Sequence, residues 1–159
     1  MSDLNNRIIE SCLKQDSIQT FYSSIPRGDD FLIENLWSSP QAIFLTIAAK
    51  ATGKHILVIS GESHDQGTLF QDLDFFGEHP ILEFPAWETL PNENIPPSPD
   101  IVGERYKVLE HITQSKNPLI ILTTVQALLQ KIVAQPVFEQ LSLHLAETMT
   151  IPFTELIEK

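Results

Sequence analysis

The sequence predicts an α/β fold in which helices cover both faces of a parallel sheet, giving three layers. Three short apolar runs, at residues 56–59, 81–84 and 119–122, have the length and composition of buried strands. Helical patterns separate these runs, and strands that alternate with helices form right-handed crossovers within one parallel sheet. The length of 159 residues suits about one domain with a hydrophobic core.

The residues before the first strand predict three helices. Apolar residues at helical spacing mark a helix at the N-terminus, and a second helix follows over 18–25. Ser38 or Ser39 can cap a third helix, with Pro40 in its first turn, where no backbone donor is needed. Gly53 stands where a left-handed residue commonly ends a helix.

Later helices have comparable boundary residues. Gly77 ends the helix after the first strand, and Ser98 caps the helix that precedes the last strand. The stretch 87–99 contains four prolines, which predicts a loop. Thr123 or Thr124 caps a final helix. We expect one apolar face of that helix to pack inward, formed by Val125, Leu128, Leu129 and Ile132.

The pattern changes near Leu141. Leucines alternate with other residues over 141–145, which predicts a half-exposed strand. We therefore expect three parts. They are an N-terminal helical segment over 1–30 that packs on the sheet, an α/β domain over 31–138, and the truncated start of a second, α+β domain over 139–159.

The charge balance limits the classes of partner. Twenty-one acidic and ten basic residues give a net charge of −11, and the basic residues are scattered, which argues against direct binding to nucleic acid. An acidic surface suits a basic protein partner, although solubility alone also explains it. No apolar stretch is long enough to cross a membrane. With Cys12 as its one cysteine, the chain has no internal disulfide or thiolate zinc cluster, and we expect a cytoplasmic protein.

Gly53-Lys54 is the segment most similar to a phosphate-binding loop, which requires G-x-x-x-x-G-K-[ST]. Ala48 occupies the first glycine position, and His55 follows the lysine. The pair also lies between a helix end and a strand start, where the helix dipole repels phosphate. The sequence therefore predicts a helix cap here.

The other candidate chemistries also lack their residues. The strand at 119–122 ends without the carboxylate that would hold magnesium in a nucleotide hydrolase. The five histidines never lie three or four positions apart, as metal ligands on one helix would. We predict no catalytic residue, cofactor site or metal site. A small nucleotide-binding or hydrolysing α/β domain with an unconventional site stays open as the alternative.

One loop segment attracts attention because Trp87 and Glu88 adjoin each other at the end of a predicted strand. A tryptophan beside an acid in a loop stiffened by prolines suits a binding edge. It also suits a packing residue that pins the loop to the sheet, and packing is the commoner role of large aromatic side chains.

The segment FPAWETLPNENIPPSPDIVGERYKVLEHI, residues 84–112, resembles the N-terminal module of the bacterial transcription-repair coupling factor (Mfd) family. The segment LIILTTVQALLQKIV, residues 119–133, is similar to the strand and helix that follow in the family. The similar order and spacing extend over about residues 40–158. The family motif is carried by Trp87 to Pro91, Ser98-Pro99, Asp100-Ile101 and Arg105.

The resemblance implies a function in DNA repair. The family displaces RNA polymerase stalled at a lesion with an ATP-driven DNA translocase, and it recruits the excision-repair subunit UvrA. Its N-terminal region is similar to domain 1a of UvrB, with a degenerate nucleotide site. In this sequence the segment 35–42, NLWSSPQA, contains no glycine where the phosphate loop would lie.

The resemblance also assigns partners to parts of the protein. UvrA would dock mainly on the second domain, which begins near Leu141, and polymerase, DNA, ATP and magnesium would bind later domains of the full-length protein. This chain is then expected to be a non-catalytic interaction or regulatory module. The candidates for its partner or interdomain surface are Trp87, Glu88, Arg105, Phe153 and Glu155.

Overall fold

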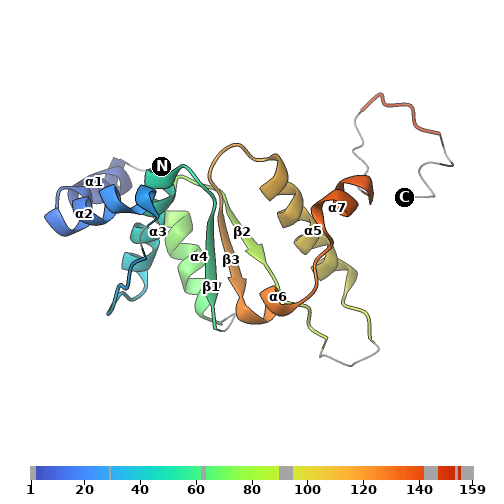
Figure 1. The fold of residues 1–159 in the computed structure, drawn as a ribbon, viewed down its shortest axis with the longest axis horizontal. Helices are drawn as coiled ribbons and strands as arrows, with labels where there is room; N and C mark the ends of the chain where they lie inside the picture. Colours follow the sequence, from blue (N-terminus) through green and yellow to red (C-terminus); the bar gives the residue numbers. More distant parts are fainter. Residues whose placement is uncertain are drawn as a thin grey trace.

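Three parallel strands with helices on both sides make up most of the computed structural model (Figure 1). The structure describes residues 3–28, 30–61, 64–89, 95–141, 147–152 and 154. The strands are β1 (Ile56–Ser60), β2 (Ile81–Phe84) and β3 (Ile120–Thr124). The helices are α1 (Asp3–Leu13), α2 (Asp16–Ser24), the 3-10 turn η1 (Ile25–Arg27), α3 (Ser39–Thr52), α4 (His64–Phe76), α5 (Pro99–Gln114), α6 (Val125–Leu129) and α7 (Gln135–Leu141).

The sheet has the strand order β1-β3-β2, with every pair parallel. Ile120 at the start of β3 is in register with Ile56 on one side and Ile81 on the other. All five residues of β3 are buried, because this strand has a neighbour at each edge and helices on each face. The predicted parallel α/β sheet is confirmed.

Alternate residues of β3 point to two separate cores. Leu122 packs with residues of α3 and α4 on one face, and Ile121 packs with residues of α5 and α6 on the other. Figure 1 shows α3 and α4 on one side of the sheet and α5 on the opposite side. The cover is incomplete over β1, where Leu57 and Ile59 are each 51% exposed. These two residues share the α5 face with Ile121, according to the strand register.

The N-terminal helices extend the α3 side of the molecule. Ile9 of α1 and Ile18 of α2 are buried against Ile47 of α3, and Ile8 packs against the core shared by α3, α4 and β3. Figure 1 shows α1 and α2 beyond α3, on the side away from α5. The N-terminal segment therefore packs mainly on α3 and adds Ile8 to the core between the helices and the sheet.

Most of the predicted helix boundaries that depend on local chemistry are confirmed. The serine cap predicted for α3 is not, because Ser38 at its N-cap makes no capping hydrogen bond and its hydroxyl bonds to Asp72 instead. Pro40 lies in the first turn of α3, and Gly53 ends this helix with a left-handed φ of 61°. The Ser98 hydroxyl caps α5, and the Thr124 hydroxyl caps α6 by accepting a hydrogen bond of 3.1 Å from the Ala127 amide. Each of these signals acts within a few residues, so it can be recognised in the sequence.

The prediction for the final helix was wrong in length and orientation. α6 ends at Leu129, and its buried residue is Ala127. The four apolar residues expected to pack inward are exposed, from 44% to 83%: Val125, Leu128, Leu129 and Ile132. Gln130 leaves the helix with ψ of 144°, because its side chain bonds to the backbone of a distant loop. α7, which follows, was not predicted.

Two further predictions concern residues that the structure does not describe. The alternating strand predicted over 141–145 falls almost wholly on such residues, and so does most of 153–159. The division into three parts at residues 30 and 138 stays a prediction. Within the described ranges, no helix has the length and apolar character needed to span a membrane.

Candidate interaction site

A hollow of 680 Å³ opens beside the start of α3, and we call it the α3 hollow. Among the residues that line it are Trp37, Ser38 and Gln41 before and within α3, and Ser60 and Gly61 at the end of β1. A nucleotide would bind near this helix start if the chain had a working phosphate loop. None of the described residues that line the hollow is charged. Polyphosphate would therefore find no lysine or arginine among these residues.

The backbone before α3 has the shape of a loop that glycine would suit, but it has no glycine. Asn35 has φ of 57° and Ser38 has φ of 51°, both in the left-handed region that glycine adopts most easily. The hydroxyl of Ser38 donates a hydrogen bond of 3.1 Å to Oδ2 of Asp72, on α4. A carboxylate thus lies near the positive end of the α3 dipole, where it would repel phosphate.

Gly53-Lys54 lies at the other end of α3. The amide of Gly53 donates a 3.0 Å hydrogen bond to the carbonyl of Ala49, and this bond closes the helix. Lys54 is exposed at the C-terminal end of the dipole, where a cation is favourable and a phosphate is not. The interpretation of this pair as a helix cap is confirmed.

A second group of predicted residues converges on Arg105, which is only 4% exposed. Its Nη1 donates to the Pro85 carbonyl at 2.7 Å and to Oε1 of Gln130 at 3.1 Å. The guanidinium carbon lies 4.2 Å from the ring centroid of Phe84 and 5.0 Å from that of Trp87, within the range of cation–π attraction. Burial lowers the pKa of the Arg105 guanidinium, but the group stays protonated, as arginine does throughout proteins.

Gln130 connects Arg105 to the loop after β2. Its Oε1 accepts a 2.7 Å bond from the Trp87 amide, and its Nε2 donates to the Trp87 carbonyl at 3.2 Å. One side-chain amide therefore pairs with both backbone polar groups of Trp87, as a neighbouring strand would. This role could not be recognised from the sequence, because the two residues are 43 positions apart.

Glu88 holds the start of α5. Its Oε1 accepts a hydrogen bond of 2.9 Å from the amide of Ser98, the residue that caps this helix. Hydrogen bonds from the Glu88 amide and then from the Ser98 amide lower the pKa of the Glu88 carboxyl below its ordinary 4.5. The two ends of the proline-rich loop are thus joined through one charge-assisted bond.

The structure brings together three of the five residues predicted for a partner surface. Trp87 is half-buried against Arg105, and Glu88 is exposed next to it in the chain. Phe153 and Glu155 lie outside the described residues. A packing role accounts for the contacts of Trp87 and Arg105, and a partner role for this group stays a prediction. Lys131, at the edge of the same group, was not singled out in the sequence.

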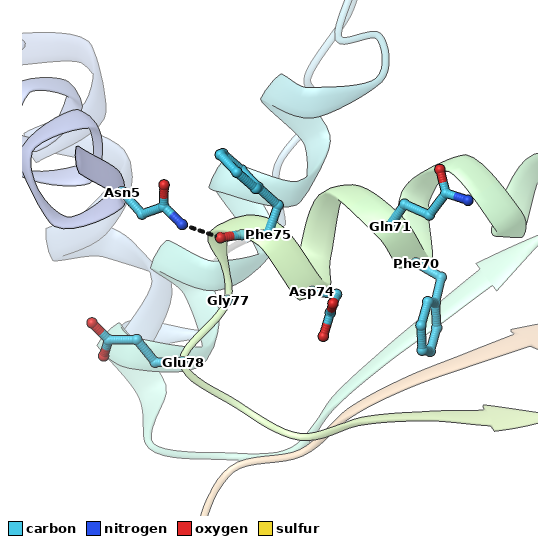
Figure 2. A pocket seen from close by; sticks show the side chains of 7 residues that line it. All are labelled: Asn5, Phe70, Gln71, Asp74, Phe75, Gly77 and Glu78. Atoms are coloured by element: carbon cyan, nitrogen blue, oxygen red, sulfur yellow. Dashed lines mark hydrogen bonds between the residues drawn. The ribbon is translucent and has the colours of Figure 1, made fainter. Parts of the chain in front are cut away.

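Another hollow, of 880 Å³, lies where the N-terminal helices meet the end of α4 (Figure 2). Figure 2 shows the buried Asn5 side chain of α1 donating a hydrogen bond to the backbone carbonyl of Phe75. Asp74 and Glu78 also line this hollow. Oε1 of Glu78 lies 3.9 Å from Nζ of Lys50. In the described parts of the chain, no three His, Cys, Asp or Glu side chains are placed to hold a metal ion.

We predict that Trp87→Ala lowers the free energy of unfolding by about 3 kcal/mol, because it leaves a cavity beside Arg105 and removes an aromatic ring from its guanidinium. Urea denaturation followed by circular dichroism measures the change. Trp37→Ala is the matched control, since Trp37 is 77% exposed and its loss should change stability by less than about 0.5 kcal/mol. Equal effects of the two substitutions would contradict the packing role.

We predict that Glu88 makes stability depend on pH. Because folding lowers the pKa of the Glu88 carboxyl, its stabilising effect is present above its ordinary value of 4.5 and is lost as pH falls through the lower folded value. The melting temperature of the natural chain should therefore exceed that of Glu88→Gln at pH 6. Acidification below about pH 4 should narrow this difference. A difference that stays constant down to pH 3 would contradict the capping role of the charge.

Comparisons with known proteins give one informative match. No family profile matches the chain, and no solved structure is significantly similar to it. Over 101 residues, which are 64% of its length, the chain is 28% identical to the transcription-repair-coupling factor of Rickettsia bellii (strain RML369-C). The matched region is 9% of that protein, so the chain spans less than a tenth of this relative. The match supports a relation to the family that residues 84–112 resemble.

Proposed function

We propose that this chain is a non-catalytic interaction module of a transcription-repair coupling factor. The proposed full-length factor couples the removal of stalled RNA polymerase to nucleotide excision repair, and this chain is one part of it. The similarity to the Rickettsia bellii protein supports a role in DNA repair. The proposed full-length protein uses ATP and magnesium for translocation on DNA, and this chemistry belongs to other domains.

The observation that carries the non-catalytic role is the chemistry at the start of α3. Nucleotide binding there requires backbone amides that reach the phosphates and a cation that neutralises them. The α3 hollow has no charged residue in the part of its lining that the structure describes, and Asp72 accepts a hydrogen bond from Ser38 at the helix start. Both features favour an uncharged occupant over a polyphosphate. They disfavour the alternative of an unconventional nucleotide site.

The docking role rests on charge and on the placement of the predicted second domain. A net charge of −11 speeds encounter with basic partners and opposes approach to DNA. We propose that UvrA docks mainly on the domain that begins near Leu141, with this chain as its rigid support. Polymerase and DNA would then contact later domains only.

We predict that the chain does not bind ATP. In isothermal titration with ATP and magnesium, no binding should be detected up to about 1 mM, which corresponds to a binding free energy weaker than about −4 kcal/mol. Asp72→Asn serves as a control, since it removes the repelling charge without adding a cation and should also show no binding. Micromolar binding by the natural chain would support the nucleotide-binding alternative.

We predict that residues 1–159 bind UvrA weakly or not at all, and that a chain extended through the second domain binds it. Pull-down with tagged UvrA, followed by titration calorimetry, compares the two lengths. The extended chain provides most of the docking surface in this proposal, so it should retain UvrA under conditions in which 1–159 is washed away. Tight binding by 1–159 would place the docking surface within the α/β domain.

A further inference from the structure

A hollow of 220 Å³ lies between α5 and the segment that follows α6, and we call it the α5 hollow. The residues that give it chemical character are Trp87, Val102, Arg105, Tyr106, Lys131 and Ile132. Apolar and aromatic groups form most of the wall. Two of them also face solvent, since Tyr106 is 39% exposed and Ile132 is 58% exposed. The hollow has room for one or two side chains of a partner.

The charge of this lining is opposite to that of the whole chain. Among the described residues that line it, Arg105 and Lys131 are charged and none is acidic, in a protein with a net charge of −11. Acids line two other hollows: Asp74 and Glu78 in one, Glu83 and Glu104 in the other. The α5 hollow is therefore a local positive site on an acidic molecule.

Neither cation is neutralised within the described residues. Arg105 is nine-tenths buried or more, and its bonds go to neutral acceptors on Pro85 and Gln130. Its Nη2 is buried and meets no acceptor among the described side chains and backbone. Lys131 is exposed and forms no ion pair in the same parts of the chain. A buried guanidinium without an anion keeps much of its field, because water screens it poorly.

We propose that the α5 hollow binds a protein segment in which a carboxylate adjoins an aromatic or branched aliphatic side chain. The apolar group would fill the space beside Trp87 and Ile132, and the carboxylate would pair with Lys131 at the rim, in the field of Arg105. Recognition of this kind combines a desolvated apolar anchor with electrostatic complementarity. The inference goes beyond the proposed function, because it concerns a partner segment other than UvrA and does not depend on nucleotide binding.

The test uses Trp87 as its own reporter. The chain has two tryptophans, and Trp37→Phe leaves Trp87 as the sole one. The probe is the peptide acetyl-Leu-Asp-Phe-Glu-Leu-amide, titrated into this variant while tryptophan fluorescence is recorded. The comparison peptide is its neutral isostere, acetyl-Leu-Asn-Phe-Gln-Leu-amide. We expect saturable binding of the acidic peptide, with the isostere weaker by about tenfold or more.

Lys131→Gln tests the rim contact in a variant that keeps the buried core. The substitution should weaken binding of the acidic peptide by about two- to fivefold, as expected for the loss of an exposed ion pair. Higher salt should reduce this difference in affinity between the natural chain and the variant. Lys54→Gln is the matched control, because Lys54 is an exposed lysine at the C-terminal end of α3 and should have no effect.

Three results would overturn the proposal. They are equal binding of the acidic and neutral peptides, no binding of the acidic peptide at about 1 mM, and stronger quenching by an octathymidylate than by the peptide. The last result would assign the positive lining to nucleic acid. None of these outcomes depends on the ATP or UvrA measurements, so failure here and failure of the proposed function can be told apart.

Discussion

The guanidinium of Arg105 lies where the end of β2, the middle of α5 and the segment after α6 converge. It bonds to the Pro85 carbonyl and to Gln130, and Gln130 in turn holds both backbone polar groups of Trp87. Two aromatic rings flank the charge, and each such contact contributes about 2 kcal/mol when desolvated. An unsatisfied donor in the same group costs about 1–3 kcal/mol. The cation is thus kept in the core by aromatic rings and neutral acceptors in place of an acid.

The hydrogen bonds around Arg105 and Gln130 also hold the loop that follows β2 in place. The loop after β2 is fixed at its start by Gln130 and bonded through Glu88 to the start of α5. The Trp-Glu pair of the family-like motif therefore has a structural task in this fold. Among the residues that line the hollow beside this pair, Lys131 and Ile132 are exposed.

The sequence was sufficient for features that depend on neighbouring residues. The strands were visible as apolar runs, and helix ends were visible at Pro40, Gly53 and Ser98. It also singled out Trp87 and Arg105, which the fold brings together. It could not show the end of α6, because that end depends on hydrogen bonds between residues 43 positions apart. The apolar periodicity after β3 then suggested a longer, buried helix where the structure has a short, exposed one.

The open side of β1 has a consequence for how the protein behaves in solution. This strand is at the edge of the described sheet, and Leu57 and Ile59 leave apolar surface uncovered beside it. Edges of this kind tend to associate with one another. A net charge of −11 opposes such contacts by mutual repulsion, and that repulsion weakens as salt shortens the range of the field. We therefore expect the net charge to oppose association at this edge, and we expect higher ionic strength to weaken that opposition.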